Sequence, residues 1–191
     1  MSTKPVLLLD QDGPLANFDL AFWDACQVAD IPMNITSLED EGRKRFMSDN
    51  VLAGHHRRSR KLVEAQGWFE NLPIVDGAQD GVAILEQHFD VWICTKPLEA
   101  NPWCRDEKAA WIRRFFPHLE EKLILAPDKG MVRGAILLDD AIKLKWLSHA
   151  EWHPVVFPTV FNGEDSVWEG LDRWTWGDPI EKLLDFVVPI I

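Results

Sequence analysis

The sequence predicts a doubly wound α/β fold, in which helices cover both faces of a central parallel sheet. Short apolar runs recur along the 191 residues, and several of them end in acidic or polar residues. Stretches with helical spacing separate these runs. Near-continuous apolar strands that alternate with helices are typical of a parallel sheet that is buried on both faces.

Five apolar runs are the expected strands. They are VLLLD at 6–10, DVWICT at 90–95, KLILA at 122–126, GAILLDD at 134–140 and PVVFP at 154–158. The stretches 77–89 and 103–116 are the clearest expected helices between them. The length fits one globular domain, or one domain that carries a modest insertion.

The interval between the first two strands is too long for an ordinary crossover. About eighty residues separate them, whereas a strand-helix-strand unit needs only a few dozen. The interval contains helix-like segments (FDLAFWDACQVAD, SLEDEGRKRFMSDNVL and HHRRSRKLVEAQ) and no strong strand pattern. We therefore predict a small helical cap at residues 17–72, inserted after strand one into a core formed by residues 1–16 and 73–191.

Charge and composition limit the partners. The chain has 20 Lys and Arg against 31 Asp and Glu, a formal net charge of -11, which argues against a nucleic acid polymer as partner. No apolar run reaches the ~18 residues of a membrane span, and the first run is too short for a signal peptide. The three cysteines lack metal or disulfide spacing. We expect a cytoplasmic protein without a membrane partner.

The cluster HHRRSRK at 55–61 is the only strongly basic stretch. The simpler interpretation is a solvated helix face that offsets the acidic surface. The alternative is that the cluster attracts an anionic substrate.

Polar side chains follow the apolar runs, where ligands of open α/β sheets bind. They are Asp10 and Asp12 after the first run, Thr95 and Lys96 after the second, Lys108 in the next helix, and Asp139 and Asp140 after the fourth. Carboxylates gathered on one edge repel one another unless a divalent cation lies among them, and oxygen ligands favour Mg²⁺. Since Mg²⁺ commonly takes a phosphate oxygen as a ligand, the set predicts phosphoryl chemistry.

The residue types suggest a chemical role for each side chain. Asp10, at the end of a strand, can attack phosphorus and form an aspartyl-phosphate. Asp12, in the loop, can protonate the leaving alkoxide and later activate water. Thr95 and Lys108 can bind phosphate oxygens, and Asp139 or Asp140 can complete the metal shell. Each residue alone has an ordinary structural explanation, so the prediction depends on the ordered set.

Four segments carry a resemblance to a known family. DQDGPLANF resembles the D-M-D-G-V-L-A-D-F opening of the 5'(3')-deoxyribonucleotidases of the haloacid dehalogenase (HAD) superfamily. GWFENLPIVDGA at 67–78, VWICTKPL at 91–98 and the stretch 104–140 are also similar to segments of that family. The resemblance implies a Rossmann-like HAD core with a helical cap after strand one, and Mg²⁺-dependent removal of phosphate from deoxyribonucleoside monophosphates.

The resemblance also implies a role for each matching residue. It makes Asp10 the nucleophile and a metal ligand, and Asp12 the acid/base, whose backbone carbonyl also meets the metal. Asp140 becomes the third metal ligand, with Asp139 in support. Thr95 and Lys108 become the phosphate clamps.

The substrate-binding residues follow less directly. In the family the base packs on aromatic side chains of the cap, which indicates Phe18 and, by a looser match, Phe46 and Met47. Lys96 stands where the family has Ser. It adds a second cation beside the phosphate site.

Other functions stay open at this point. The same machinery could serve another small phosphate ester. A non-catalytic phosphate-binding module is a further alternative, although the presence of both Asp10 and Asp12 argues against it. A phosphorylatable receiver domain does not carry its acceptor Asp on the first strand followed by Asp-Gly. The sequence does not fix the oligomeric state, and a homodimer stays open.

Overall fold

The computed structural model describes residues 4–40, 47–160, 162 and 166–187. Its centre is a parallel sheet of six strands in the order β3-β2-β1-β4-β5-β6, which confirms the predicted fold class. The strands are β1 (Val6–Leu9), β2 (Asp90–Thr95), β3 (Leu123–Leu125), β4 (Ile136–Asp139), β5 (His153–Val156) and β6 (Asp172–Arg173).

The first strand lies between β2 and β4. Leu7 is in register with Val91 of β2 and with Ile136 of β4. From β1 the chain adds strands on one side as far as β3, and then crosses to add β4, β5 and β6 on the other side. The strand order therefore reverses at β1, and a ligand crevice is expected at its carboxyl end.

The two faces of the sheet are covered differently. Leu7 and Leu9 pack in the cluster that includes buried residues of α3 (Ala78–His88), α4 (Cys104–Phe115) and α5 (Ile180–Leu184). Leu8 points to the other face, because side chains alternate along a strand. There it packs with large side chains such as Trp146 and Trp168.

Two short 3-10 helices, η4 (Leu144–Ser148) and η5 (Ser166–Trp168), supply part of the cover on that second face. The other 3-10 helices of the described chain are η1 (Met47–Asn50), η2 (Pro117–Lys122) and η3 (Lys129–Met131). Trp146 belongs to η4 and Trp168 to η5. Tryptophan side chains thus form part of the apolar cluster on this face of the sheet.

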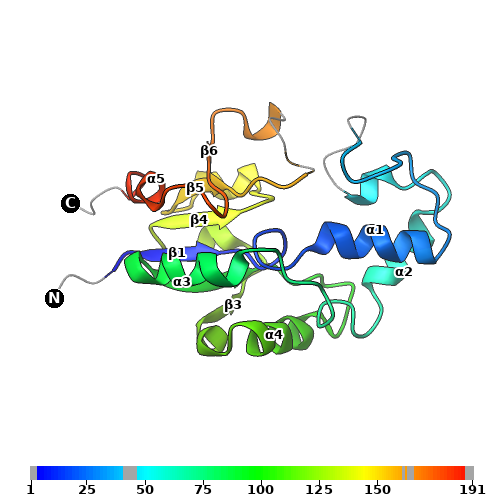
Figure 1. The fold of residues 1–191 in the computed structure, drawn as a ribbon, viewed down its shortest axis with the longest axis horizontal. Coiled ribbons are helices and arrows are strands. Elements are labelled where there is room, and N and C mark those ends of the chain that lie inside the picture. The colour runs from blue at the N-terminus through cyan, green and yellow to red at the C-terminus, as the bar shows by residue number, and fades with distance from the viewer. Residues whose placement is uncertain (1–3, 41–46, 161, 163–165, 188–191) are drawn as a thin grey trace.

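A small helical region follows β1, as predicted. It contains α1 (Phe18–Val28) and α2 (His56–Val63), which lie beyond the carboxyl end of β1 (Figure 1). The Asn17 side chain accepts a hydrogen bond from the Leu20 N–H (3.1 Å) and caps α1. The region has its own small apolar cluster, to which Phe22 of α1 and Val63 of α2 contribute. Its treatment as a separate cap at 17–72 stays a prediction.

One expected helical stretch in this region has a different structure. Of residues 37–52, the described part holds turns and the short η1 rather than an α-helix. The Asp40 carboxylate accepts hydrogen bonds from the N–H and hydroxyl of Thr36. Such local side-chain bonds stabilise a loop in competition with a helix.

Two chain segments connect this region to the sheet. They run side by side, because the Asn17 N–H donates to the Pro73 carbonyl (2.8 Å) and the Val75 N–H to the Leu15 carbonyl (2.7 Å). The returning segment is also attached to α4. The Glu107 carboxylate, which is buried, accepts hydrogen bonds from the backbone N–H groups at 67 and 69.

No helix in the described ranges is both long and apolar enough to cross a membrane. The three cysteines are free and buried, in agreement with the absence of disulfide spacing in the sequence.

Candidate active site

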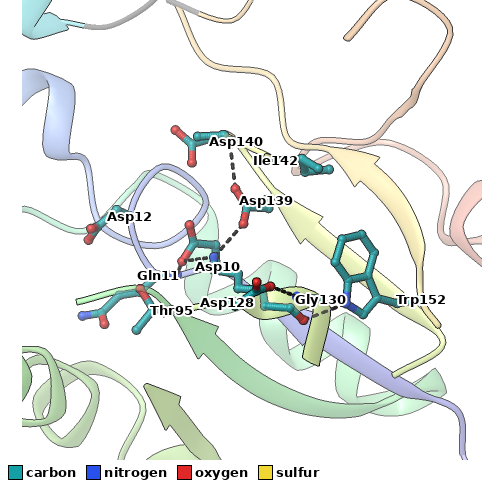
Figure 2. A network of polar contacts seen from close by, with 12 residues as sticks. Asp10, Gln11, Asp12, Thr95, Asp128, Gly130, Asp139, Asp140, Ile142 and Trp152 are labelled. Carbon is teal, nitrogen blue, oxygen red and sulfur yellow. Dashed lines mark hydrogen bonds and ion pairs between the residues drawn. The ribbon is translucent and has the colours of Figure 1, made fainter. Parts of the chain in front are cut away.

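Three carboxylates meet at the carboxyl edge of the sheet. Asp10 follows β1, Asp139 ends β4, and Asp140 comes next in the chain. One carboxylate oxygen from each lies within 4.8 Å of the others. Figure 2 shows them at the ends of their strands, with Asp12 in the loop beyond Asp10. The Asp10 N–H donates to the Leu138 carbonyl (2.9 Å), so the two strand ends are held together.

A buried lysine joins two of these carboxylates. Lys129 Nζ lies 2.8 Å from Asp10 Oδ1 and 2.6 Å from Asp139 Oδ2. Asp10 Oδ1 also accepts a hydrogen bond from the Gln11 N–H (2.8 Å), so the orientation of the nucleophile candidate is fixed. Sequence reasoning did not select Lys129. It follows β3 within the LILAPDK segment, and the strand-end rule used for the other residues could have found it.

Asp12 belongs to a second polar group. The fully buried ammonium group of Lys108 lies 2.7 Å from Asp12 Oδ2 and 3.1 Å from Thr95 Oγ1. The structure therefore brings together the three residues that the sequence places after β1, on β2 and on α4. Burial raises the pKa of Asp12 more than the neighbouring Lys108 lowers it. A carboxyl group in that environment is suited to donate a proton.

The fit of a metal ion depends on Asp140. Burial and the charges of Asp139 and Asp10 raise the pKa of Asp140 well above its ordinary value. A carboxylate oxygen of Asp140 lies within 4.8 Å of one from Asp10 and one from Asp139. Three carboxylates this close form an all-oxygen donor set, so the residues fit a hard divalent cation. Asp10 and Asp140 would hold it, with Asp139 beside them.

Gly13 keeps the D-x-D loop close to Asp140. Its φ is +91°, and a Cβ added there would lie 2.7 Å from Asp140 Cβ and closer still to Asp140 Cγ. We expect Gly13→Ala to displace Asp140 and to weaken Mg²⁺ binding by roughly 10- to 100-fold, the usual effect of disturbing the support of a metal ligand. Mg²⁺-dependent shifts of the melting temperature measure this effect.

Gly54 provides the matched control for that substitution. It has a φ of +90°, and a Cβ added there would have nothing within 4 Å, so Gly54→Ala carries the same backbone strain without the collision. Equal Mg²⁺ affinity in the two variants would show that contact with Asp140 is not the reason for the glycine.

A cavity of about 990 Å³ opens from this cluster toward the helical region. Asp10, Asp12 and Asp140 line the cavity at the acidic cluster, and Phe18 and Phe22 also line it as apolar groups. The volume is at the upper end of that of ordinary small-molecule sites. The cavity therefore has room for a ligand larger than the phosphate group alone.

The residues expected to bind the substrate lie in different places in the structure. Phe18 lines the cavity and packs edge-on against Trp68, with ring centroids 5.8 Å apart. Phe46 lies outside the described residues. Met47 begins η1, and its side chain is not described. Lys96 is exposed and does not line the cavity.

Other cavity residues were not anticipated from the sequence. Asp19 lines the catalytic end, and burial together with the charge of Asp12 raises its pKa to about 7. His56 and Arg60 line the wall formed by α2. Part of the basic cluster at 55–61 therefore borders the cavity, although His56 and Arg60 are exposed, as the simpler interpretation of a solvated face expects. Arg58 of the same helix is directed to the Ala29 carbonyl instead (2.6 Å).

Comparisons with known proteins identify the family of the chain. Residues 4–162 match the model of the family described as 5' nucleotidase, deoxy (pyrimidine), cytosolic type C protein. A protein of Bordetella pertussis named "Putative 5'(3')-deoxyribonucleotidase" is 30% identical over 174 residues, covering 90% of this chain and 92% of that protein. The mitochondrial 5'(3')-deoxyribonucleotidase of Mus musculus is 27% identical over 187 residues, covering 94% of this chain and 84% of that protein.

A solved structure supports the fold independently. A haloacid dehalogenase-like family hydrolase of Streptococcus pneumoniae superposes with a TM-score of 0.61 at 14% identity, covering 97% of this chain and 100% of the other. At that identity the likeness concerns the fold alone.

Proposed function

The chain belongs to the 5' nucleotidase, deoxy (pyrimidine), cytosolic type C family, and on that premise we propose that it is a Mg²⁺-dependent phosphatase of (deoxy)ribonucleoside monophosphates. The observation that carries the proposal is that Asp10 and Asp12 line a cavity of about 990 Å³, while Lys108 contacts both Asp12 and Thr95. This arrangement supports a nucleophile, an acid and phosphate-binding groups that act on one substrate.

In the first proposed step Asp10 attacks the phosphorus of the bound monoester. The new bond joins an Asp10 carboxylate oxygen to phosphorus, and the bond from phosphorus to the ester oxygen breaks. Asp12 gives its proton to the departing alkoxide, so the nucleoside leaves as an alcohol. Lys108 and Thr95 bind the phosphate oxygens while charge shifts among them.

In the second step water releases the phosphate. Asp12, now a carboxylate, takes a proton from a water molecule, and the resulting hydroxide attacks the aspartyl-phosphate. The bond between Asp10 and phosphorus breaks, which releases inorganic phosphate. Asp10 is then a carboxylate again, and Asp12 a carboxylic acid. Asp10, Asp140 and the Asp12 carbonyl would hold Mg²⁺, and its positive charge would offset the repulsion between the carboxylates and the phosphate.

The nucleoside part of the substrate is assigned to the cavity. Phe18 and Phe22 offer an apolar wall for a base. His56 and Arg60 offer polar groups farther from the acidic cluster. The match to a deoxyribonucleotidase family supports a nucleotide over another small phosphate ester.

Phosphate release from a panel of ribo- and deoxyribonucleoside 5'- and 3'-monophosphates tests the proposal. We expect release in the presence of Mg²⁺ and a loss to background with a chelator, because the carboxylates then repel the phosphate. An aryl phosphate serves as control. Hydrolysis of the aryl phosphate but of no nucleotide would overturn the substrate assignment, and silence on all substrates would favour a non-catalytic module.

A further inference from the structure

A buried asparagine holds the segment that follows β5. Asn162 is only 2% exposed, and its side chain is hydrogen-bonded to backbone groups. Its Oδ1 accepts a hydrogen bond from the Thr159 N–H (2.8 Å), and its Nδ2 donates one to the Phe157 carbonyl (2.6 Å). Buried polar groups that find partners in this way make their surroundings rigid. The two bonds therefore fix Phe157 and Thr159 relative to Asn162.

A third bond of the same side chain reaches one of the clustered carboxylate residues. Asn162 Nδ2 also donates to the backbone carbonyl of Asp140 (2.9 Å). Next to this bond in the chain, the Phe157 N–H donates to the Asp139 carbonyl (3.0 Å). The chain after β4 and the chain after β5 are thus connected at the edge of the sheet where the carboxylates meet.

The segment that Asn162 holds is part of the cavity wall. Residues 157–160 all line the cavity, as does Asp140. Asn162 is itself held in place, because Nη1 of Arg173 in β6 donates to its backbone carbonyl (3.1 Å). A displacement of Asn162 would therefore affect the cavity wall and the backbone of Asp140 at the same time.

We infer that Asn162 is a positioning residue, which holds the backbone of Asp140 against the cavity wall 157–160. The inference rests on the proposed function for the role of Asp140 as a ligand of Mg²⁺. It makes metal binding and the order of the wall two coupled events, and such coupling is reciprocal. Mg²⁺ demands near-ideal octahedral geometry, whereas Ca²⁺ accepts an irregular set of ligands. Loss of the bond to Asp140 should consequently affect Mg²⁺ more than Ca²⁺.

Calorimetric titration of the whole chain with Mg²⁺ and with Ca²⁺ tests the inference without any turnover. We expect Asn162→Ala to weaken Mg²⁺ binding by roughly 10- to 100-fold, the usual effect of removing the support of a metal ligand. Ca²⁺ binding should weaken by less, so that the preference for Mg²⁺ over Ca²⁺ falls. A purely structural role of Asn162 would lower the melting temperature and leave this preference unchanged.

Asn101→Ala is the matched control. Asn101 is 3% exposed and makes the same kinds of bond, since its Nδ2 donates to the carbonyls at 63 and 65 and its Oδ1 accepts from the Trp103 N–H. None of these four groups belongs to Asp10, Asp139 or Asp140. We expect the two variants to lose melting temperature to a similar extent, and only Asn162→Ala to lose Mg²⁺ affinity. Equal Mg²⁺ affinity in the two variants would overturn the inference, as would absence of Mg²⁺ binding by the unmodified protein.

Amide hydrogen exchange of the unmodified protein gives a second measurement, which does not depend on whether a variant folds. If release of the Thr159 N–H from Asn162 weakens the metal site, bound Mg²⁺ must disfavour that release by the same factor. We expect saturating Mg²⁺ to slow exchange of the Thr159 amide about tenfold and to leave the Trp103 amide unchanged. Exchange at Thr159 that does not respond to Mg²⁺ would contradict the inference. Slower exchange in a protein that hydrolyses no nucleotide would support it while the proposed function fails.

Discussion

Asp10→Asn is expected to abolish phosphate release while the protein stays folded. The amide has the shape of the carboxylate but cannot attack phosphorus, and loss of a covalent nucleophile lowers kcat by roughly 10³-fold or more. Lys129 keeps its 2.6 Å contact with Asp139 in this variant, so the buried ammonium group retains a partner. Steady-state phosphate release at saturating Mg²⁺, with the melting temperature recorded alongside, measures both parts of the expectation.

Acid quenching separates this nucleophilic role from a purely electrostatic one. A monophosphate that is radiolabelled in its phosphate group should leave acid-stable label on the unmodified protein and none on Asp10→Asn. A variant that retains a tenth of the activity, or that still becomes labelled, would assign the nucleophile to another residue.

Lys129→Met is expected to have the largest effect on stability. It leaves the Asp10 and Asp139 carboxylates close together and buried without their cation. Removing one partner of a buried ion pair costs about 3–5 kcal/mol. Urea unfolding of the metal-free protein measures the change, and added Mg²⁺ should restore part of the lost stability because it neutralises the same carboxylates.

Lys122→Met is the matched control for burial. Lys122 Nζ contacts Asp90 Oδ1 at 2.7 Å, but both side chains are more than one third exposed. An exposed pair of this kind contributes about 0–1 kcal/mol. Similar losses in the free energy of unfolding for the two substitutions would mean that burial does not explain the contribution of Lys129 to stability.

The sheet could be predicted closely, because its central strands carry the strongest signal. The expected strand 90–95 coincides with β2, and the run at 6–10 contains β1. These strands are buried on both faces, so nearly every side chain is apolar. The edge strand β6 pairs on one side only and consists of two polar residues. It offers no apolar run to recognise.

The same reasoning explains which site residues were found. Asp10, Asp12, Thr95 and Lys108 were predicted together, because parallel strands end at one edge and the sheet order brings their ends into contact. Lys129 begins η3 after β3, so the strand-end rule could have placed it at this edge, but a lysine at such a position is ordinarily expected to be solvated. Only its pairing with carboxylates such as Asp10 makes burial favourable, and that pairing depends on three-dimensional neighbours.

Glu107 and Lys108 are consecutive residues of α4, and they hold different parts of the molecule. Glu107 is bonded to the backbone of the segment that returns from the helical region, whereas Lys108 is bonded to Asp12 and Thr95. One turn of helix thus connects the segment at 67–69 with Asp12 and Thr95. Because the two residues are adjacent in α4, a displacement of that segment is expected to move the Lys108 ammonium group relative to Asp12 and Thr95.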